Sequence, residues 1–504
     1  MNESEQLDAQ SSGFGKLKSI FWPIHRYELK KFLPMSFLMF CVLFVYTMIK
    51  DLKDVFILKY ATCGGTELLP VLKLWFVMPM AFMFAIVFTF LVNKFGNKKT
   101  FYIVICTFLL FYLLFVTVLF PQAKMGHIHA GEETIRNLQN SLPRVFYYVV
   151  PCVTNWAYTM FYCFSEIWGK AVIGSLFWQF ANRITKKDEV ERFYGLYSMI
   201  ANIGVIISGG SLERISRTTD NMFDRNVKIL IGCCILFGVA AMAIFYYINK
   251  VVLNDPRFYD PEIVREKPKE DSVGVLEGLK ILFTSRYVGL IAILLMAYGT
   301  TLNFIEVIWK DHMRATLPNP NDCASMLGNL SMTVGITTIL TTLLSTIIMR
   351  NFKWKVAALI SPICTLLSGL VFFALVVYNK MGASHIHGLS IPIMILWSGL
   401  ITIALVRSVK YCLFDTTRNM AFRPLDENIK TKGQASVEVV AGGAGKASAS
   451  TVTYTLTNIV DKGSRVSAHL LIIVPIFFAV ALGWIAAVFG LSKKYEAKIA
   501  EKSE

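Results

Sequence analysis

The stretch FYIVICTFLLFYLLFVTVLF, residues 101–120, decides the class of fold. It contains no charged residue, and it lacks the alternation of apolar and polar residues that is typical of a membrane β-strand. A helix of about 20 residues is long enough to cross the ~30 Å hydrocarbon core of a bilayer. Similar uncharged runs occur at 33–49 and 470–489. The sequence therefore predicts an all-α polytopic membrane protein.

The composition of the chain agrees with this class. Of the 504 residues, 55% are apolar and 17% are charged. In a soluble protein, roughly a quarter of all residues are charged. The net charge of +16 could indicate a nucleic-acid partner, but Lys and Arg lie mainly in short loops and form no recognition motif. Membrane topology, with an anionic substrate as a further contributor, explains the excess of positive charge. No nucleic-acid partner is expected.

Twelve transmembrane helices are predicted, and the fourth is the longest. We interpret it as one tilted helix kinked at Pro151, because two short segments would place the two termini on opposite faces of the membrane. The predicted spans are residues 33–50, 68–92, 100–120, 145–182, 193–212, 228–249, 287–309, 325–349, 354–378, 389–415, 434–459 and 467–490.

The basic residues alternate along the segments that join these spans. The N-terminal segment, every second loop and the C-terminal tail hold most of the Lys and Arg. The positive-inside rule therefore predicts that both termini and the long central loop are cytoplasmic. Residues 1–32 are polar and basic, and the span that follows is too long for a cleavable signal peptide.

The central loop divides the chain into two six-helix halves. The predicted domains are a cytoplasmic segment at 1–32, a bundle at 33–249, a cytoplasmic linker at 250–286, a bundle at 287–490 and a cytoplasmic tail at 491–504. Two parallel six-helix repeats are the plan of the major facilitator superfamily, in which the substrate binds between the halves. A major-facilitator-like fold is therefore expected.

Weak internal repeats support a duplication. Lys124-Met125-Gly126 recurs as Lys380-Met381-Gly382 at an offset of about 256 residues, and the same offset relates Lys53 to Trp309. A His-x-His pair follows each copy, at 127–129 and at 385–387. Such pairs could supply metal ligands, but we interpret them as solvated residues of outer loops and expect no metal site.

Four ionisable residues inside or at the ends of predicted spans matter most, because each such residue costs about 2.5–3.5 kcal/mol unless it faces water, a partner or a substrate. They are Lys53, Glu166, Glu306 and Lys446. Alternatively, Lys53 and the nearby Lys50 could reach the outer headgroups. Glu306 could instead be a solvated residue at the end of its helix. Glu166 is far from either interface, and Lys446 lies among small residues that permit close approach of a helix or a ligand.

These charges favour a polyphosphate substrate, because several lysines in a low-dielectric cavity attract such an anion strongly. Trp168 and Trp309 lie beside the charges and could stack on a base, although packing is the commoner role of such rings. Gly445-Lys446 does not complete a P-loop, because Val440 and Ala447 stand where Gly and Ser or Thr are required. No nucleophile–base pair or set of metal ligands accompanies the charges, so we do not expect an enzyme.

A set of motifs resembles the nucleotide transporter (ATP/ADP translocase) family of obligate intracellular bacteria and plastids. The similarity extends from about residue 22 to residue 495. Its marks are Tyr46-Thr47, Lys53-Asp54, Ser165-Glu166-Ile167-Trp168-Gly169, Leu176-Phe177-Trp178-Gln179-Phe180-Ala181-Asn182, Ala297-Tyr298-Gly299, Glu306-Val307-Ile308-Trp309-Lys310, Lys410-Tyr411-Cys412-Leu413-Phe414-Asp415, Pro424-Leu425-Asp426 and Lys432-Gly433-Gln434-Ala435. The chain departs from the family pattern Leu-Gly-Lys-Ser-Gly-Gly in span eleven, where it has Ala444-Gly445-Lys446-Ala447-Ser448-Ala449.

The resemblance implies an ATP/ADP antiporter of the bacterial inner membrane that uses no cofactor and brings host ATP in and sends ADP out by alternating access. ATP, ADP and the lipid bilayer are the expected partners, and a monomer is the expected functional unit. The charged transport residues of the family match Lys53, Glu166, Glu306 and Lys446, with Lys50 as a weaker candidate. We expect the two glutamates to pair with lysines in the empty carrier. Some members of the family import nucleotides with protons instead, and Glu166 or Glu306 would then carry the proton.

Overall fold

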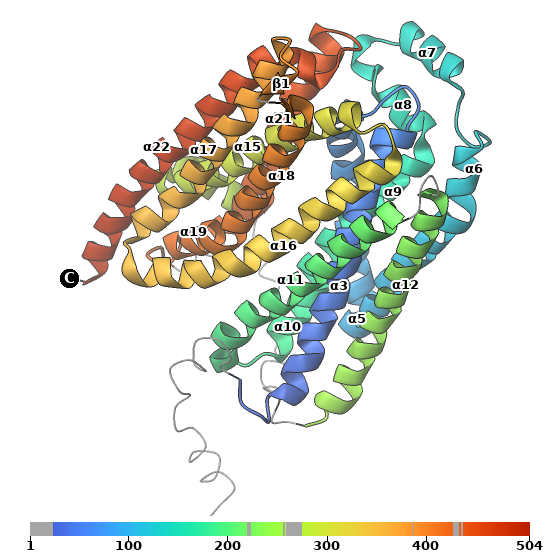
Figure 1. Ribbon diagram of the computed structural model, residues 1–504. Helices are drawn as coiled ribbons and strands as arrows, with labels where there is room; N and C mark the ends of the chain where they lie inside the picture. The colour runs from blue at the N-terminus through green and yellow to red at the C-terminus, as the bar shows by residue number, and fades with distance from the viewer. Residues whose placement is uncertain are drawn as a thin grey trace, which may run out of the picture.

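A computed structural model describes residues 24–218, 223–255, 258, 275–386, 388–426, 433–434 and 437–503. Most of the predicted N-terminal segment, much of the central linker and His387 of the second His-x-His pair lie outside these residues. The described chain is almost entirely helical (Figure 1). The predicted all-α membrane fold is therefore confirmed.

The first group of helices precedes the central linker. Its α-helices are α3 (Leu29–Val55), α4 (Leu68–Val71), α5 (Met78–Leu114), α6 (Phe120–Lys124), α7 (Glu132–Ser141), α8 (Val149–Thr154), α9 (Trp156–Trp168), α10 (Trp178–Ile184), α11 (Lys187–Thr218) and α12 (Phe223–Tyr247). Wider π-helical segments continue or join several of them, at Phe56–Tyr60, Leu72–Val77, Phe115–Leu119, Gly169–Phe177 and Ile248–Val252. A 3₁₀ turn lies at Arg144–Phe146.

The second group of helices repeats this plan. Its elements are α14 (Val275–Thr284), α15 (Arg286–Thr316), α16 (Pro320–Asn351), α17 (Trp354–Lys380), β1 (His385–Ile386), β2 (Leu389–Ser390), α18 (Ile391–Val409), α19 (Asp415–Ala421), α21 (Gly442–Tyr454) and α22 (Leu470–Ser503). π-Helical segments lie at Lys410–Phe414, Val437–Ala441 and Thr455–Val460, and a 3₁₀ turn at Val466–His469. The two short strands form an antiparallel hairpin.

Within the described part of the chain, nine helical runs are long and apolar enough to cross a bilayer. The predicted spans 68–92 and 100–120 share one of these runs, Leu68–Lys124, in which Gly96 has a φ of 72° and reverses the chain. Glycine adopts this left-handed region at little cost because it has no Cβ. The predicted spans 145–182 and 434–459 are divided into shorter helical segments. The count of twelve therefore stays a prediction.

The fourth predicted span is broken at a different residue from the one expected. Pro151 lies inside α8, and the break falls at Asn155, whose φ and ψ are −94° and 41°. The Asn155 side-chain amide donates a hydrogen bond to the Pro151 carbonyl at 2.8 Å, which stabilises the end of α8. The predicted kink at Pro151 is thus wrong in position, because the proline sits in the first turn of a short helix, where its ring is tolerated.

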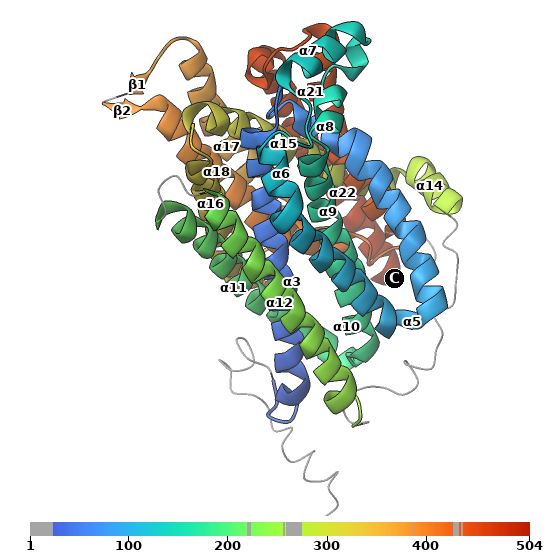
Figure 2. The ribbon, with the colours of Figure 1, turned by 90° about the vertical axis from the view of Figure 1, so that its right-hand side faces the viewer.

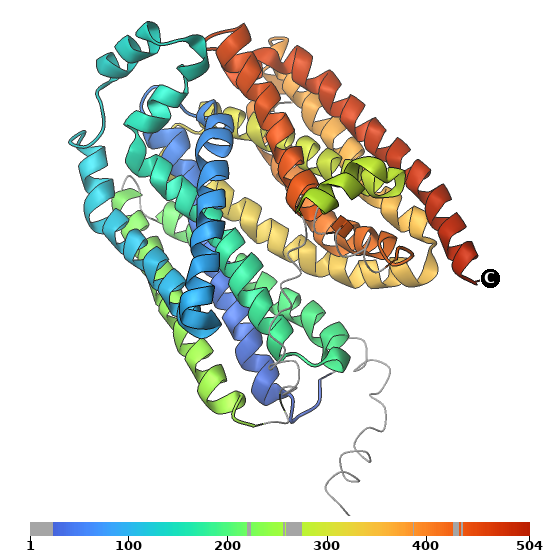
Figure 3. The ribbon, with the colours of Figure 1, turned by 180° about the vertical axis from the view of Figure 1, so that it is seen from behind.

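The two groups lie side by side and diverge toward the end at which α3 begins and α22 ends, which we call the termini end (Figures 1 and 3). The hairpin β1–β2 and the helices α7 and α8 lie at the opposite end, which we call the closed end (Figure 2). Helices α11 and α16 form the most extensive contact between the groups, and α21 packs against α4 in a second one.

Glycines bring α11 and α16 close together. A Cβ placed on Gly209 would lie 2.6 Å from the Gly328 carbonyl oxygen, and the reverse distance is the same. Gly335 lies against the backbone of Asn202 in the same interface. Small residues permit such close helix packing in membranes, where lipid supplies no hydrophobic drive for association. This interface therefore holds the two groups together by close backbone contact.

Large apolar side chains cover the outer surface. Phe82 and Ile86 on α5 are each 71% exposed, one helical turn apart. Leu471 at the start of α22 is 75% exposed. Surfaces of this kind are stable in hydrocarbon, where helices also satisfy their own backbone hydrogen bonds. The outer surface thus fits the bilayer, and the charged side chains gather between the groups.

Candidate functional site

The last turns of α3 place Lys53 against Glu166 of α9. The Lys53 Nζ lies 3.1 Å from the Glu166 Oε1 and 2.9 Å from the Asp54 Oδ1. The ring of Tyr162 lies 3.8 Å from the same ammonium group, one helical turn before Glu166 and on the same face of α9. The Lys53 side chain is 3% exposed, while 26% of the Glu166 side chain remains accessible. The two residues that the sequence singled out are therefore an ion pair with one accessible carboxylate.

Asp54 joins this pair to the second group of helices. Its Oδ2 accepts a hydrogen bond from the Lys310 Nζ of α15 at 2.7 Å. The two residues are 256 positions apart, which is the offset between the sequence repeats. They thus occupy equivalent places in the two halves and meet between them. Both side chains are at least nine-tenths buried, so this bond is shielded from water.

Glu306 pairs with an arginine and not with a lysine. Its Oε1 accepts a hydrogen bond from Arg407 of α18 at 2.6 Å. Both side chains are slightly exposed, at 14% and 13%. The pair joins α15 to α18 in the second group, as Lys53–Glu166 joins α3 to α9 in the first, with the signs of the charges exchanged. The expected pairing of Glu306 with a lysine is not the arrangement here.

Lys446 of α21 is exposed, and its backbone is fixed by α15. The Asn303 Nδ2 donates a hydrogen bond to the Lys446 carbonyl at 2.8 Å. The Asn303 Oδ1 accepts a hydrogen bond from Lys73 of the first group, also at 2.8 Å. The charges of Lys73 and Lys446 both act on Glu166. Asn303 therefore holds Lys73 of the first group and the backbone of Lys446 of the second group close together, near the Glu166 carboxylate.

The small residues around Lys446 allow α21 to approach α15 closely. A Cβ on Gly445 would lie 2.7 Å from the Met296 carbonyl oxygen, whereas a Cβ on Gly443 would meet nothing within 4 Å. Thr300 completes the contact by bonding the Gly445 carbonyl at 3.0 Å. The close helix packing that the small residues indicated is thus present.

We expect Gly445→Val to lower the stability of the protein by about 1–3 kcal/mol, because overpacking of this size forces the backbones apart. Gly443→Val is the matched control on the same helix. Thermal unfolding of the purified protein in detergent measures the effect. Equal transition temperatures for the two variants would show that the contact between α15 and α21 does not constrain this helix.

Lys50 lies one turn before Lys53 and is partly exposed. Its Nζ is 3.9 Å from the Asp51 Oδ1, and the charges of Arg407 and Glu306 act on it. The Asp51 Oδ2 accepts a hydrogen bond from the Ser331 Oγ of α16 at 2.5 Å. Lys50 therefore lies between the two ion pairs and within reach of both groups.

The two tryptophans pack inside their own groups. The Trp168 Nε1 donates to the Val42 carbonyl at 3.3 Å, and the Trp309 Nε1 donates to the Leu396 carbonyl at 2.8 Å. Both rings are fully buried. Their indoles are inaccessible in this conformation, so the predicted base stacking has no support from this arrangement. Tyr411, which is 53% exposed beside Lys410, is an accessible aromatic ring that the sequence pattern did not indicate as a site residue.

Hydrogen bonds between the groups seal the closed end. Lys59 donates to the Arg314 carbonyl at 2.9 Å, and the Arg314 guanidinium lies 3.3 Å from the Glu67 carboxylate. The Asn458 Oδ1 accepts from the Tyr148 amide at 3.1 Å. The charged cluster lies beside this seal, because Lys53 and Asp54 are in the last turn of α3. The conformation is therefore closed at one end and diverges at the other.

One histidine of the first His-x-His pair contributes to the closed end. The ring of His129 lies 4.8 Å from that of Tyr158, and burial lowers the pKa of His129 to about 4. The described residues contain no group of three or more His, Cys, Asp or Glu arranged to hold a metal ion.

We expect the stability of the protein to fall as the pH falls from about 6.5 to about 4. The folded state keeps His129 neutral in this window, while the unfolded state binds a proton, so protonation favours unfolding. The His129→Gln variant should lose less stability over the same window. Transition temperatures at pH 7 and pH 5 measure the difference, and identical shifts for both proteins would contradict a contribution from His129.

The described helices form a membrane-protein fold of the major-facilitator type. The chain is similar to the inward-facing structure of a bacterial homologue of the iron transporter ferroportin, with a TM-score of 0.59, 10% identity and coverage of 93% of this chain and 100% of that one. It is also similar to a D-xylose–proton symporter, with a TM-score of 0.58, 13% identity and coverage of 92% and 97%. These likenesses concern the fold alone.

The sequence comparison identifies the family. The model of the TLC ATP/ADP transporter family matches residues 7–495, and the chain belongs to this family. Its relatives include ADP,ATP carrier protein 1 of Chlamydia pneumoniae, which is 35% identical over 97% of this chain and 96% of the relative. ADP,ATP carrier protein 1 of Rickettsia bellii is 34% identical over 95% and 96%. The predicted family is confirmed, and the protein is a transporter and not an enzyme.

Proposed function

We propose that this protein exchanges ATP for ADP across a bacterial inner membrane, with no cofactor, by alternating access of the bundles 33–249 and 287–490. The observation that carries the proposal is the cluster of cations from both groups around the accessible Glu166 carboxylate. A nucleotide polyphosphate has about three to four negative charges at pH 7. Membership of the ATP/ADP transporter family and the ADP,ATP carriers among its relatives support this choice of substrate.

Lys53 and Lys446 are the proposed phosphate ligands, and Lys50 is a weaker one. Lys446 is exposed and forms no ion pair with another described residue, so its ammonium group can reach a phosphate directly. Lys53 is held by Glu166 and Asp54 at 3.1 and 2.9 Å, so a phosphate must compete with these carboxylates for it. Charge-assisted bonds to phosphate are strong enough for such competition. We add Lys73 to the proposed ligands, because Asn303 places it beside the backbone of Lys446.

The ion pairs explain strict exchange. In the empty carrier, Glu166 and Glu306 neutralise Lys53 and Arg407. A bound polyphosphate displaces these carboxylates, which frees them to rearrange when the two groups rock. Without the anion, rearrangement would leave cations unpaired in a low-dielectric contact, which costs several kcal/mol. The empty carrier therefore reorients slowly, and a nucleotide must be carried on each transit.

Counter-exchange in proteoliposomes tests the proposal. Vesicles that contain the purified protein are loaded with ADP, with ATP, with GTP, with phosphate or with buffer alone, and labelled ATP is added outside. We expect rapid uptake only when ADP or ATP is inside. Uptake into vesicles without internal nucleotide that stops on addition of an uncoupler would favour proton-coupled import, with Glu166 or Glu306 as the proton carrier. No uptake under any of these conditions would contradict nucleotide transport.

The proposed orientation places both termini in the cytoplasm, so that the diverging termini end opens inward. The basic residues of the loops at this end support the orientation, because cytoplasmic loops of membrane proteins are enriched in Lys and Arg. We further propose that one chain is sufficient for transport, since the charged cluster is made from the two groups of a single chain.

A further inference from the structure

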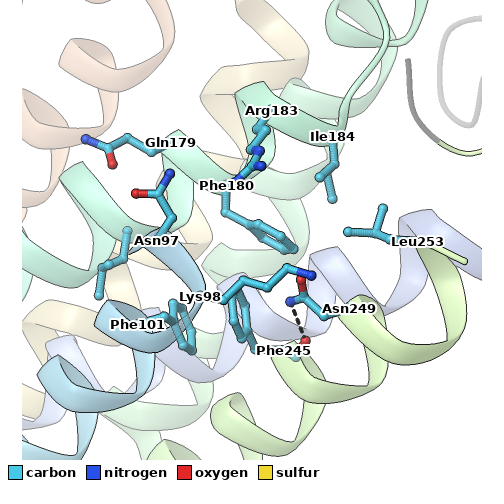
Figure 4. Close-up of a pocket in the computed structure, with 11 residues that line it drawn as sticks. Asn97, Lys98, Phe101, Gln179, Phe180, Arg183, Ile184, Phe245, Asn249 and Leu253 are labelled. Atoms are coloured by element: carbon cyan, nitrogen blue, oxygen red, sulfur yellow. Dashed lines mark hydrogen bonds between the residues drawn. The ribbon is translucent and has the colours of Figure 1, made fainter. Parts of the chain in front are cut away.

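A second basic site lies away from the charged cluster, in a cavity of the first group of about 170 Å³ (Figure 4). Three segments form it. The turn after Gly96 contributes Asn97 and Lys98, α10 contributes Gln179 and Arg183, and the end of α12 with the π-helical segment that follows contributes Asn249. These segments lie near the end of the molecule at which α3 begins (Figures 1 and 2). In the proposed orientation, the cavity is therefore at the depth of the cytoplasmic headgroups.

The floor of the cavity is a stack of aromatic rings. The rings of Phe101 and Phe245 are parallel with their centroids 3.7 Å apart, and the ring of Phe180 lies 4.7 Å from that of Phe245. Phe101 and Phe245 are each 2% exposed. The packed rings fix the three helices at this point, so the polar side chains above them start from a rigid base.

Two cations and an unsatisfied acceptor face this floor. Lys98 and Arg183 enter from opposite sides of the cavity (Figure 4), and the described residues that line it include no Asp or Glu. The Asn249 Nδ2 donates to the Phe245 carbonyl at 2.9 Å. The Asn249 Oδ1 is buried and has no hydrogen-bond partner among the described residues. A buried acceptor of this kind is costly unless a ligand supplies a donor.

These features require a ligand with an anionic group and a hydroxyl donor. Arginine and lysine bind phosphate with charge-assisted hydrogen bonds. A hydroxyl next to the phosphate would donate to the Asn249 Oδ1. Clusters of Lys and Arg at the cytoplasmic end of membrane helices bind the headgroups of anionic lipids. A soluble phosphate ester such as glycerol phosphate has the same polar groups but no acyl chains to hold it at the membrane surface.

We propose that this cavity binds the phosphodiester headgroup of an anionic, hydroxyl-bearing phospholipid, with Lys98 and Arg183 on the phosphate and Asn249 on the hydroxyl. The site is separate from the proposed nucleotide site and does not depend on it. Because it connects the turn at Gly96 to α10 and to the end of α12, a bound lipid stabilises the termini end of the first group.

Native mass spectrometry of the full-length protein tests the proposal. The protein is taken from nanodiscs of phosphatidylcholine alone or with phosphatidylglycerol. We expect the wild type to retain one phosphatidylglycerol that the double variant Lys98→Gln, Arg183→Gln retains about ten-fold less, because it loses two charge-assisted contacts. Lys94→Gln is the matched control, since Lys94 lies two residues before Gly96 and does not line the cavity. Equal retention by the double variant and the wild type overturns the proposal.

Two further measurements keep the proposal falsifiable. Gln179→Glu leaves both cations in place and adds a negative charge to the exposed rim, so it should weaken retention of phosphatidylglycerol without affecting the packed rings. Glycerol phosphate and inorganic phosphate are added to the protein in detergent, and neither should raise its transition temperature. Saturable stabilisation by glycerol phosphate that the double variant lacks would overturn the lipid as the source of the phosphate.

Discussion

Replacing Lys446 with alanine is expected to reduce uptake of labelled ATP by about ten- to a hundred-fold. A hydrogen bond to a charged group contributes about 1.5–3 kcal/mol, and each 1.4 kcal/mol is a factor of ten. Lys446 is exposed and has its backbone held by Asn303, so its ammonium group is positioned to meet a phosphate. The side chain is exposed, so we expect its loss to leave membrane insertion normal. Uptake into proteoliposomes loaded with ADP measures the effect.

Two controls separate the charge of Lys446 from its shape. Lys446→Arg keeps the charge and should retain part of the uptake, although its planar group cannot copy the geometry of an ammonium. Lys494→Ala removes an exposed lysine of α22 near the C-terminal tail and should have no effect. Unchanged uptake by Lys446→Ala would remove Lys446 from the proposed site.

The membrane class and the main helical runs could be predicted because they follow from local hydropathy. Runs such as 33–50 and 354–378 fall within α3 and α17, with ends that differ by a few residues. Spans four and eleven are less regular, since polar residues and π-helical segments divide them. The position of the break at Asn155 was not predictable from Pro151, because proline breaks a helix only when it lies beyond the first turn.

The charged residues of the site were found by their cost in a membrane, but most of their partners were not. Sequence gives the depth of a residue in a span and not the direction in which its side chain points. Arg407 and Lys73 lie inside predicted spans and were missed, because charges near span ends have the alternative of reaching the headgroups. The offset between the sequence repeats could have predicted one of these contacts. It relates Asp54 to Lys310, and opposite charges at equivalent positions can meet between two related halves.

Replacing Lys310 with methionine is expected to open the closed end. The Asp54–Lys310 bond joins the two groups in a contact shielded from water. Removing one partner of a buried ion pair costs about 3–5 kcal/mol. Asp54 keeps its bond to Lys53, so we expect the lower limit of about 3 kcal/mol. This energy corresponds to a roughly hundred-fold shift of the conformational equilibrium toward the state in which this end of the molecule has opened. Exchange should also slow, because one of the two conformations is no longer well populated.

Spin labels at positions 125 and 381, in a cysteine-free background, measure this opening directly. Met125 and Met381 are exposed, and they are equivalent residues of the two sequence repeats in different groups of helices. The distance between the labels should lengthen in Lys310→Met. It should remain unchanged in Lys380→Met, because the partners of Lys380 among the described residues are carbonyls of the second group. The same distribution in wild type and Lys310→Met would mean that the remaining contacts of the closed end, such as Arg314 with Glu67, suffice to hold it. A longer distance would instead identify the pair at equivalent repeat positions as the element that biases the conformational equilibrium, since the substitution leaves those other contacts in place.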